Sequence, residues 1–302
     1  MFIDIKGYPT QKYIPAGRNV GYIETVHGGV GRNVAEDLAN IGLHPILLSM
    51  QDESGSSREL LQRLSERGVD ISAIGSAESG LGTWLAIFDN AGEVVASISR
   101  RCDLTGLKRI LESRGDEIFR DADSVVLEID IEAEIVSIIF ELAKKYNKRV
   151  YALVSNMTVA LERMDYICRT DCFVCNQQEA GILFSRDLSS HTPDEMCAAL
   201  PELVRQAGIH QMVVTMGEQG AVYVDASGNS GAVPAVKTTV KDTTGAGDAF
   251  CAGLSAGLTY GKSMKESCVL GTQIAAMVIT DTNNVCPILS EQERSQLQIP
   301  LI

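Results

Sequence analysis

The sequence predicts one α/β domain, with helices on both faces of a mostly parallel sheet and a small β lid. Apolar strand-like runs alternate with longer helical patterns, the order that a parallel sheet needs because crossover helices join its strands. One segment, residues 82–99, breaks this alternation and is typical of a hairpin. The 302 residues, 45% of them hydrophobic, suffice for one large core, and no internal repeat or long linker divides them. We therefore expect a single three-layer α/β/α domain over residues 1–302.

The alternating elements follow one another in a regular order. The strand-like runs are 44–50, 124–130, 148–154 and 210–216. The helical patterns are 56–68, 132–147 and 194–208. Apolar residues dominate the strand-like runs, as in strands covered on both faces, whereas they recur every three or four residues in the helical patterns. The sheet is therefore expected to lie between two helical layers.

The hairpin at residues 82–99 consists of two short strands that alternate apolar and polar residues. A turn sequence, Asp89-Asn90-Ala91-Gly92, separates the two strands. Because this hairpin lies outside the main alternation, we expect it to stand apart from the central sheet as a lid.

Charge and hydropathy limit the classes of function. The net charge is −13 and the isoelectric point is about 4.8, whereas proteins that track nucleic-acid phosphates are normally basic. The first residues, MFIDIKGYPTQKY, lack the apolar core of a signal peptide, and no apolar run is long enough to span a bilayer. We therefore expect a cytoplasmic protein with reduced cysteines and with no nucleic-acid or membrane partner.

The stretch KDTTGAGDAFCAGL, residues 241–254, predicts an anion site at the start of a helix. Gly245 and Gly247 let the backbone turn tightly and approach a ligand without a side-chain clash. The first N–H groups of the following helix lack partners inside the helix, and together with the helix dipole they attract anions.

Asp248 lies in the first turn of that expected helix, and two roles are open to it. It could act only as a capping acid, because a carboxylate suits the positive end of the helix dipole. Beside a phosphate-binding site it could instead take a proton from an attacking hydroxyl group. Asp242, six residues earlier, adds a second carboxylate that could bind a cation or cap the turn.

A second glycine cluster lies in HGGVGRNVAEDLANIG, residues 27–42. Gly28 and Gly29 precede an expected helix that ends at Gly42, and Asn33 would project from its first turn. On the glycines alone, this segment is interpreted as a strand-to-helix turn.

Taken together, the two glycine clusters resemble the signatures of the ribokinase-like, or phosphofructokinase-B type, carbohydrate kinases. GGVGRN at residues 28–33 and DTTGAGD at residues 242–248 stand in the order of that family. NQQE at residues 176–179 resembles its N-x-x-E motif, and residues 213–223 resemble its nucleotide-side hairpin. The resemblance extends over nearly the whole chain.

The resemblance implies a ribokinase-like three-layer fold with lid segments near 5–27 and 81–101. It also implies an ATP-dependent kinase that phosphorylates the primary hydroxyl of a sugar or nucleoside with the help of magnesium. Residues 18–23 and 28–42 look most like the pseudouridine kinases of the family, which favours pseudouridine 5′-phosphate as the product. A kinase of another sugar or nucleoside, such as ribose, and a non-catalytic nucleoside-binding sensor remain alternatives. A homodimer through the lid is a further expectation.

On the substrate side, the resemblance assigns roles residue by residue. Asp248 would be the catalytic base, and the N–H groups of three residues would stabilise the transferring phosphoryl group: Gly245, Ala246 and Gly247. Sugar hydroxyls would be bound by Asp4, Gly29, Asn33 and Asp130, with Glu128 as the alternative to Asp130. Asn19 lies close in sequence to the glycine pair together with Tyr22 and His27, so we expect it to contact a nucleoside base, with Trp84 as a flat apolar surface.

On the nucleotide side, the same resemblance implies an ATP site and two cation sites. The ATP-binding residues would be Asn176, Thr215, Gly217, Gly220 and Thr272. Glu179 would bind magnesium through water. Asp242 and Thr244 match positions that can bind a monovalent cation such as potassium.

Overall fold

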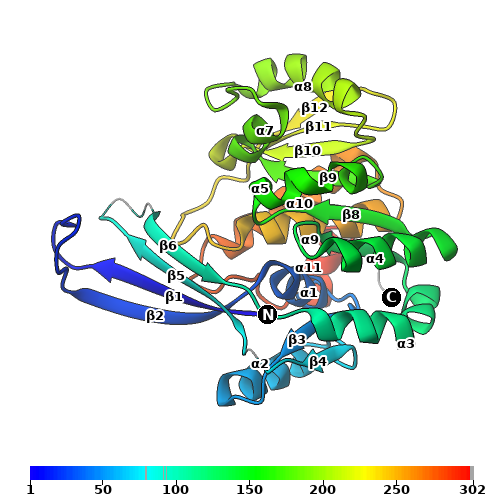
Figure 1. Cartoon of the computed structure of the whole chain (residues 1–302). Helices are drawn as coiled ribbons and strands as arrows, with labels where there is room; N and C mark the ends of the chain where they lie inside the picture. The colour runs from blue at the N-terminus through cyan, green and yellow to red at the C-terminus, as the bar shows by residue number, and fades with distance from the viewer. Residues whose placement is uncertain (79, 91, 93, 300–302) are drawn as a thin grey trace.

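The structure is built around a six-stranded sheet with the strand order β12-β11-β10-β9-β8-β7. The computed structural model in Figure 1 describes residues 1–78, 80–90, 92 and 94–299. The four parallel strands are β7 (Ser124–Glu128), β8 (Arg149–Leu153), β9 (Cys172–Asn176) and β10 (Met212–Thr215). The antiparallel strands β11 (Ala221–Val224) and β12 (Ser230–Val233) complete it. The mostly parallel sheet expected from the sequence is confirmed.

Helices cover both faces of this sheet (Figure 1). One layer contains α1 (Val30–Asn40), α9 (Ala246–Thr259) and α10 (Met264–Val278). The other contains α3 (Thr105–Asp121), α4 (Ala133–Lys145), α7 (Gln177–Phe184) and α8 (Pro193–Ala207). Along β8, Tyr151 and Leu153 pack against the first layer, and Val150 and Ala152 pack against the second. Burial on both faces explains why the parallel strands are apolar apart from their end residues.

The remaining elements flank the layers, and all of them except α2 are short. These are β3 (Ser49–Gln51), β4 (Ile74–Ser76), α2 (Gly55–Glu66), α5 (Met157–Ala160), α6 (Met164–Ile167), α11 (Glu291–Gln296) and the 3₁₀ turns η1 (Leu161–Arg163) and η2 (Gly217–Gln219). Across the described ranges, no helix combines the length and the apolar composition that crossing a membrane requires.

The apolar run at residues 44–50 forms less strand than its sequence predicts. Only its end belongs to β3, and Ile46 makes a single bridge with Asp70. Pro45 has no N–H group to donate, and β4 offers only three residues for pairing. The pairing is therefore short, although Leu47, Ser49 and Met50 remain buried.

A second sheet, here called the small sheet, projects to the left of the body in Figure 1. Its order is β2-β1-β5-β6. Its strands are β1 (Phe2–Pro9), β2 (Gly21–Gly28), β5 (Gly82–Phe88) and β6 (Val94–Arg100). The last two pair antiparallel as the predicted hairpin. Ala91, in the predicted turn, and Glu93 lie outside the described residues.

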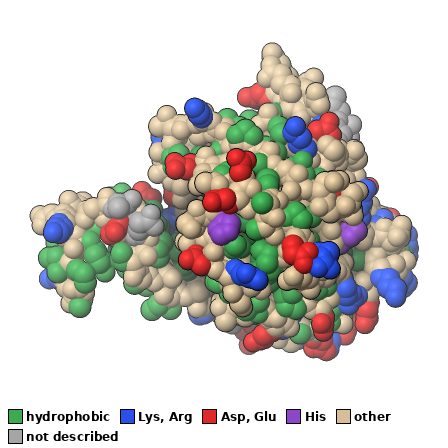
Figure 2. All heavy atoms as spheres, turned by 90° about the horizontal axis from the view of Figure 1, so that it is seen from above, with side chains coloured by type: hydrophobic (Ala, Val, Ile, Leu, Met, Phe, Trp, Pro, Cys, Tyr) green, Lys and Arg blue, Asp and Glu red, His purple; other side chains and the backbone are tan. Residues whose placement is uncertain are grey.

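The two faces of the small sheet differ in what they contact. Side chains alternate across a strand, so Asp4 and Lys6 share one face, and both reach partners in the body. On the opposite face, Ile23 and Ile98 are 74% and 72% exposed, and Leu85 is paired in register with Ile98. Figure 2 shows hydrophobic side chains on this projecting sheet.

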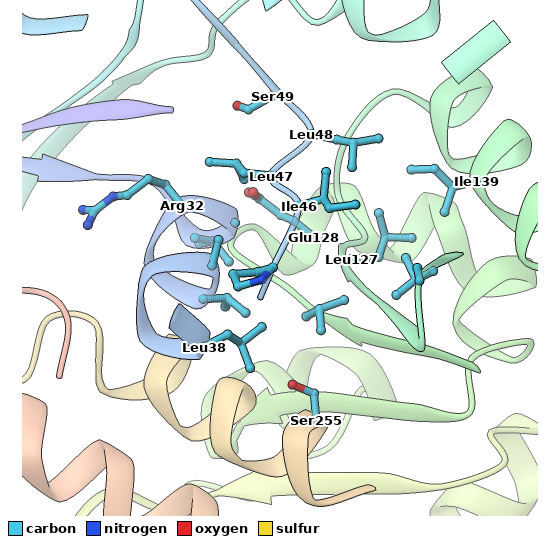
Figure 3. A pocket seen from close by; sticks show the side chains of 18 of the residues that line it. Arg32, Leu38, Ile46, Leu47, Leu48, Ser49, Leu127, Glu128, Ile139 and Ser255 are labelled. Carbon is cyan, nitrogen blue, oxygen red and sulfur yellow. The ribbon is translucent and has the colours of Figure 1, made fainter. Parts of the chain in front are cut away.

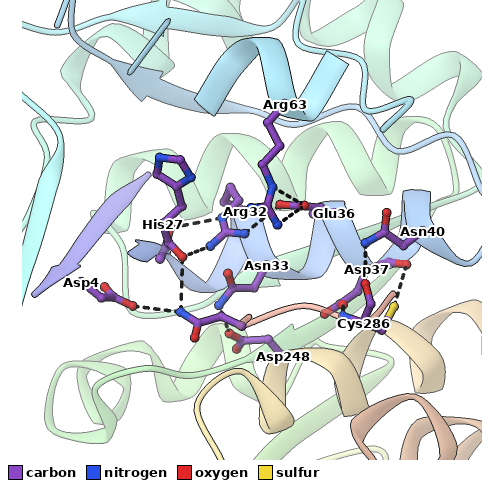
Figure 4. A network of polar contacts seen from close by, with 12 residues as sticks. Asp4, His27, Arg32, Asn33, Glu36, Asp37, Asn40, Arg63, Asp248 and Cys286 are labelled. Atoms are coloured by element: carbon purple, nitrogen blue, oxygen red, sulfur yellow. Dashed lines mark hydrogen bonds and ion pairs between the residues drawn. The ribbon is translucent and has the colours of Figure 1, made fainter. Parts of the chain in front are cut away.

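Charged and polar side chains of α1 are buried, and they fix neighbouring segments to this helix (Figure 4). Glu36 forms ion pairs with Arg32 and with Arg63 of α2. Asp37 accepts a hydrogen bond from the N–H group of Cys286 at 2.6 Å. Burial raises the pKa of Asp37 to about 8, although its hydrogen bonds from Cys286 act in the opposite direction.

We predict that Asp37→Asn stabilises the protein increasingly as the pH rises. The unfolded chain releases the Asp37 proton near pH 4, whereas the folded protein retains it up to about pH 8. The stability that this proton contributes is complete below about pH 4 and is lost as the pH rises to about 8. Asparagine has no such proton to lose. The difference in Tm between variant and wild type should therefore grow between acid and alkaline buffers, whereas the exposed control Glu141→Gln should show a constant difference. If the Tm values of Asp37→Asn and the wild type changed with pH in parallel, this account would be contradicted.

Candidate active site

The turn that leads into α9 requires glycine at position 245. Gly245 is the N-cap of α9 and has a φ of 83°, which side-chain-bearing residues rarely adopt. A Cβ atom at Gly245 would lie 2.2 Å from the carbonyl oxygen of Asn284. At Gly247, by contrast, a Cβ atom would meet nothing within 4 Å. The backbone at Gly245 is therefore fixed by close packing, and the space beside Gly247 is open.

The N–H groups at this turn are only partly engaged inside the protein. Ala246 N–H donates to the oxygen of Thr243 at 3.2 Å. The N–H groups of Gly245 and Gly247 have no acceptor among the described residues. Two of the three predicted donors are thus available to an anion, and Ala246 instead stabilises the turn.

Asp248 is the third residue of α9, and its carboxylate accepts a hydrogen bond from Asn33 Nδ2 at 2.6 Å (Figure 4). Asn33 is 3% exposed and comes from α1, so this contact joins the two glycine-containing segments. Burial raises the pKa of the Asp248 carboxyl to about 7; the Asn33 hydrogen bond lowers it, and nearby Glu128 and Asp4 raise it. A carboxylate that titrates near neutral pH is suited to accept a proton.

Asp4 of β1 lies close to the same place. It is 6% exposed, and its carboxylate accepts a hydrogen bond from Asn284 Nδ2 at 3.3 Å. Burial raises the pKa of Asp4, although the charges of Lys6 and Arg32 oppose this shift. A Cβ atom at Gly28 would lie 2.2 Å from this carboxylate, so Gly28 leaves the room that Asp4 occupies.

Gly29 and Asn33, the other predicted sugar contacts, both lie at the start of α1. Gly29 is the N-cap of that helix and has a φ of 101°. Asn33 Oδ1 is buried and accepts no hydrogen bond within the described structure. An unpartnered buried acceptor beside Asp248 is a place where a hydroxyl donor would be favourable.

Asp130, predicted to be a sugar contact, is bonded within the protein. Its side chain is fully buried, and its oxygens accept hydrogen bonds from Ser155 and form an ion pair with Arg101. Glu128, two residues earlier, accepts a single hydrogen bond, from Ser155 Oγ at 2.8 Å, and its charge acts on Asp248. Of the two acids that the sequence offered at this position, Glu128 therefore has the less engaged carboxylate.

Asn19, predicted to contact a base, is bonded within its own loop. Its Oδ1 atom accepts from Ile14 N–H at 2.8 Å, and its Nδ2 atom donates to the oxygens of Ile14 and Gly17. Asparagine commonly stabilises turns in this way. These local bonds use the amide to hold the loop between β1 and β2.

Aromatic residues cover the face of the small sheet that carries Asp4 and Lys6. The rings of Tyr8 and Tyr22 stack with centroids 5.1 Å apart, and those of Tyr8 and Phe88 with centroids 4.7 Å apart. Trp84, which is paired in register with Asp4, meets Phe88 edge to face. The sequence indicated Tyr22 and Trp84 but not Tyr8 or Phe88, because only the strand pairing shows that all four rings share one face.

On the nucleotide side, the predicted residues lie at the ends of neighbouring strands. Asn176 and Thr215 end β9 and β10 and are paired in register. Asn176 Oδ1 accepts from Glu179 N–H at 2.8 Å, and Glu179 accepts from Asn176 N–H at 2.7 Å. This reciprocal pair is a capping box for α7, a role that the N-x-x-E spacing also encodes.

Gly217 and Gly220 bound the 3₁₀ turn that follows β10. Gly220 has a φ of 96°, and a Cβ atom there would lie 2.0 Å from the oxygen of Val233. Thr272 is 7% exposed and lies in α10, which packs against β11 and β12. Its hydroxyl donates to the oxygen of Val269 at 2.8 Å.

Asp242 and Thr244, predicted to bind a monovalent cation, are both bonded to Lys6. The Lys6 ammonium nitrogen lies 2.8 Å from Asp242 Oδ2 and 3.0 Å from Thr244 Oγ1. Neither Lys6 nor this contact was indicated by the sequence. Lysine in a strand is usually solvent-exposed, so no local pattern marks it as buried.

A cavity of about 380 Å³ lies behind the sugar-side residues (Figure 3). Its lining includes Glu128 and Arg32, but the labelled side chains around it are mainly apolar, among them Leu38, Ile46 and Leu127. Neither Asp248 nor Asn176 lines it. The cavity therefore extends away from the Asp248 site into the space between α1 and β7.

Comparisons with known proteins identify the family of the chain. The family model described as "pfkB family carbohydrate kinase" matches residues 1–288. The chain is 32% identical to the guanosine-inosine kinase of Exiguobacterium acetylicum, covering 94% of this chain and 93% of that protein. It is 29% identical to the pseudouridine kinase of Escherichia coli (strain K12), covering 93% and 90%.

Solved structures show the same fold. The ribokinase of Giardia lamblia superposes with a TM-score of 0.82 at 18% identity, covering 97% of this chain and 96% of that one. The Arabidopsis thaliana ribokinase complexed with ribose and ATP has a TM-score of 0.81 at 19% identity, covering 98% and 95%. The predicted ribokinase-like α/β/α fold is confirmed.

We predict opposite stability effects for two neighbouring glycine substitutions. Gly245→Ala should lower Tm and activity together, because the new methyl group would meet the Asn284 carbonyl group at a strained φ. Gly247→Ala should leave Tm unchanged or raise it, because alanine favours the helix by about 0.4–1 kcal/mol. It should nevertheless reduce activity, since its methyl group would occupy the open space at the anion site. Thermal unfolding and initial rates measure both effects, and equal losses of Tm in the two variants would contradict this geometry.

Proposed function

Because the chain belongs to the pfkB family of carbohydrate kinases, we propose that it transfers a phosphoryl group from ATP to the primary hydroxyl of a nucleoside. The observation that carries the proposal is the position of Asp248. It stands in the first turn of α9, beside available N–H groups, and accepts a hydrogen bond from Asn33. A base adjacent to an anion site is what phosphoryl transfer to a hydroxyl requires.

In this proposal, the Asp248 carboxylate accepts the proton of the substrate hydroxyl. The hydroxyl oxygen then forms a bond to the γ-phosphorus of ATP, the bond from that phosphorus to the bridging oxygen breaks, and ADP leaves. The N–H groups of Gly245 and Gly247, with the positive end of α9, stabilise the negative charge of the transferring group. The bound Asn33 amide orients the base.

Asp4, Asn33 and Glu128 are proposed to hold the ribose hydroxyls. The carboxylates of Asp4 and Glu128 supply acceptors, and the unpartnered Asn33 Oδ1 supplies another. Each of these three residues comes from a different element, and both carboxylates act electrostatically on Asp248. This convergence supports a hydroxyl-rich substrate beside the base.

The ATP-binding residues are proposed as the sequence predicted them: Asn176, Thr215, Gly217, Gly220 and Thr272. For magnesium, Glu179 is a suitable partner because Mg²⁺ usually keeps several waters and needs only one or two protein carboxylates. The described residues contain no group of three His, Cys, Asp or Glu side chains that could hold a metal. When bound, magnesium would neutralise phosphate charge.

The aromatic face of the small sheet supports a nucleoside rather than a free sugar. Tyr22 and Trp84 offer ring surface on the same face as Asp4, and the stacked ring of Tyr8 and the buried ring of Phe88 pack beside them. A base can stack on such a surface, whereas a free sugar leaves it uncovered. We therefore propose that the small sheet acts as a lid that covers the nucleoside and excludes water during transfer.

Among nucleosides, pseudouridine remains the substrate proposed from the sequence. The relative that is 29% identical and acts on pseudouridine supports it. The relative that is 32% identical supports guanosine or inosine as the second candidate. The residues proposed for catalysis are present in this chain. This favours an active kinase over the non-catalytic nucleoside-binding sensor that the sequence left open.

The exposed outer face of the small sheet is proposed as the contact between two copies of the chain. Ile23, Leu85 and Ile98 give it an apolar stripe that a second small sheet could cover. A homodimer formed in this way stays a prediction.

We predict that Asp248→Asn folds normally but loses about 10²- to 10⁴-fold in kcat, because an amide cannot accept the hydroxyl proton. Wild-type kcat should fall about tenfold per pH unit below about pH 7 and level off above it, since the carboxyl must be deprotonated to act. Asp194→Asn is the matched control, because Asp194 is also an acid in the first turn of a helix. If both variants keep wild-type kcat, Asp248 is only a capping acid.

We predict ATP-dependent formation of pseudouridine 5′-phosphate with a kcat/KM at least about tenfold above that for ribose. That ratio needs about 1.4 kcal/mol of differential transition-state binding, which one or two contacts to the base can supply. An ADP-release assay with pseudouridine, guanosine, inosine and ribose measures it. A higher kcat/KM for guanosine or inosine would replace pseudouridine as the substrate. A preference for ribose would overturn the nucleoside assignment.

A further inference from the structure

The ammonium group of Lys6 is buried among three oxygen acceptors. Its nitrogen lies 2.8 Å from Asp242 Oδ2, 3.0 Å from Thr244 Oγ1 and 3.4 Å from Asn284 Oδ1. Lys6 is 1% exposed. A lysine ammonium has three N–H donors and no acceptor, so these three oxygens complete its hydrogen bonding.

The same oxygens would be the ligands of a monovalent cation at Asp242 and Thr244. A carboxylate, a hydroxyl and an amide oxygen suit a hard cation of single charge. In this chain the ammonium group of Lys6 already lies among these oxygens. A potassium ion bound at the same place would put two positive charges in one small site. The residues present therefore do not fit an exchangeable monovalent cation.

Lys6 also connects to the backbone that forms the anion site. Asp242 Oδ1 accepts hydrogen bonds from the N–H and the hydroxyl group of Thr244, at 2.8 and 2.7 Å. Thr244 directly precedes Gly245, whose conformation positions the first turn of α9. The Lys6 ammonium group therefore binds both Asp242 and Thr244, and the hydrogen bonds between these two residues shape the turn.

Asn284 extends the connection to the substrate side. Its Oδ1 atom accepts from Lys6, while its Nδ2 atom donates to Asp4 and to the oxygen of His27, both at 3.3 Å. Burial alone would raise the pKa of Asp242, but hydrogen bonds from Lys6 and Thr244 outweigh it and hold this pKa below its usual range. Asp242 is therefore ionised at neutral pH and needs a counter-charge.

We propose that the Lys6 ammonium is a built-in cation that replaces a monovalent metal ion and orders the Asp242–Thr244 turn before the anion site. Lys6 is a positioning residue that acts through Asp242 and Thr244. The consequence for the reaction rests on the proposed kinase function. The consequence for cation binding does not, because it concerns only the folded protein.

The first test compares initial rates in potassium chloride and in choline chloride at equal ionic strength. We expect the wild-type rate to agree within about twofold between the two salts, because no cation site is open. Lys6→Ala leaves the half-buried Asp242 carboxylate without a counter-charge and should lose at least about tenfold in activity in choline chloride. Potassium or ammonium chloride should restore much of this loss by entering the emptied space.

Two further variants separate a cation role from a merely structural one. Lys6→Met removes the charge but fills the same space, so its activity should fall without rescue by potassium. Lys108→Ala removes a surface lysine that is ion-paired with Glu134, and should behave as wild type in both salts. Potassium activation of the wild type would overturn the proposal, and so would full activity of Lys6→Ala in choline chloride. Rescue of Lys6→Met equal to that of Lys6→Ala would also overturn it.

A second readout needs no substrate. Potassium chloride should raise the Tm of Lys6→Ala relative to choline chloride, and should leave the Tm of the wild type and of Lys6→Met unchanged. A potassium-dependent Tm in the wild type would contradict the built-in cation even if the variants fail to fold. If no nucleoside is phosphorylated at all, the proposed function fails while this unfolding experiment still decides the role of Lys6.

Discussion

The hydrogen bond from Asn33 to Asp248 joins the two parts of the chain on which the site depends. Asn33 lies in the first turn of α1 and Asp248 in the first turn of α9, 215 positions later. Both helices belong to the same layer over the central sheet, so their N-terminal ends are held side by side by packing. Because both turns begin at a glycine with positive φ, the backbone leaves room for a ligand where the two helices start.

Buried polar contacts around this bond fix the surrounding segments. Glu36 and Asp37 tie α1 to α2 and to the segment at Cys286, and Lys6 ties the small sheet to the turn before α9. Removing one partner of a buried charge pair costs far more than removing both. The turn that is proposed to bind phosphate is therefore expected to be rigid. The outer part of the small sheet has few contacts with the body and is expected to move more freely.

The sequence predicted features that depend on local pattern. The alternation of strands and helices, the hairpin and the glycine turn before Asp248 are all encoded within a few residues. The sequence could not distinguish Asp130 from Glu128, because the two acids are only two residues apart. They differ in their contacts with Arg101 and with the N–H group of Ser155, which both bind Asp130 and come from distant parts of the chain. The local pattern also does not show that the Asn19 amide bonds to its own loop, so its contact with a base stays a prediction. Lys6 could not be predicted, since its partners lie 236 to 278 positions away.

The central claim is that Asp248 and the start of α9 transfer phosphate to a primary hydroxyl group. Phosphorus NMR of a reaction with ATP and each candidate nucleoside tests it most directly, because the product signal reports the atom that received the phosphate. The account predicts a new phosphomonoester signal that is split by coupling to the two 5′-methylene protons, together with ADP. Formation of ADP with inorganic phosphate alone, or of an ester coupled to a single ribose proton, would contradict it.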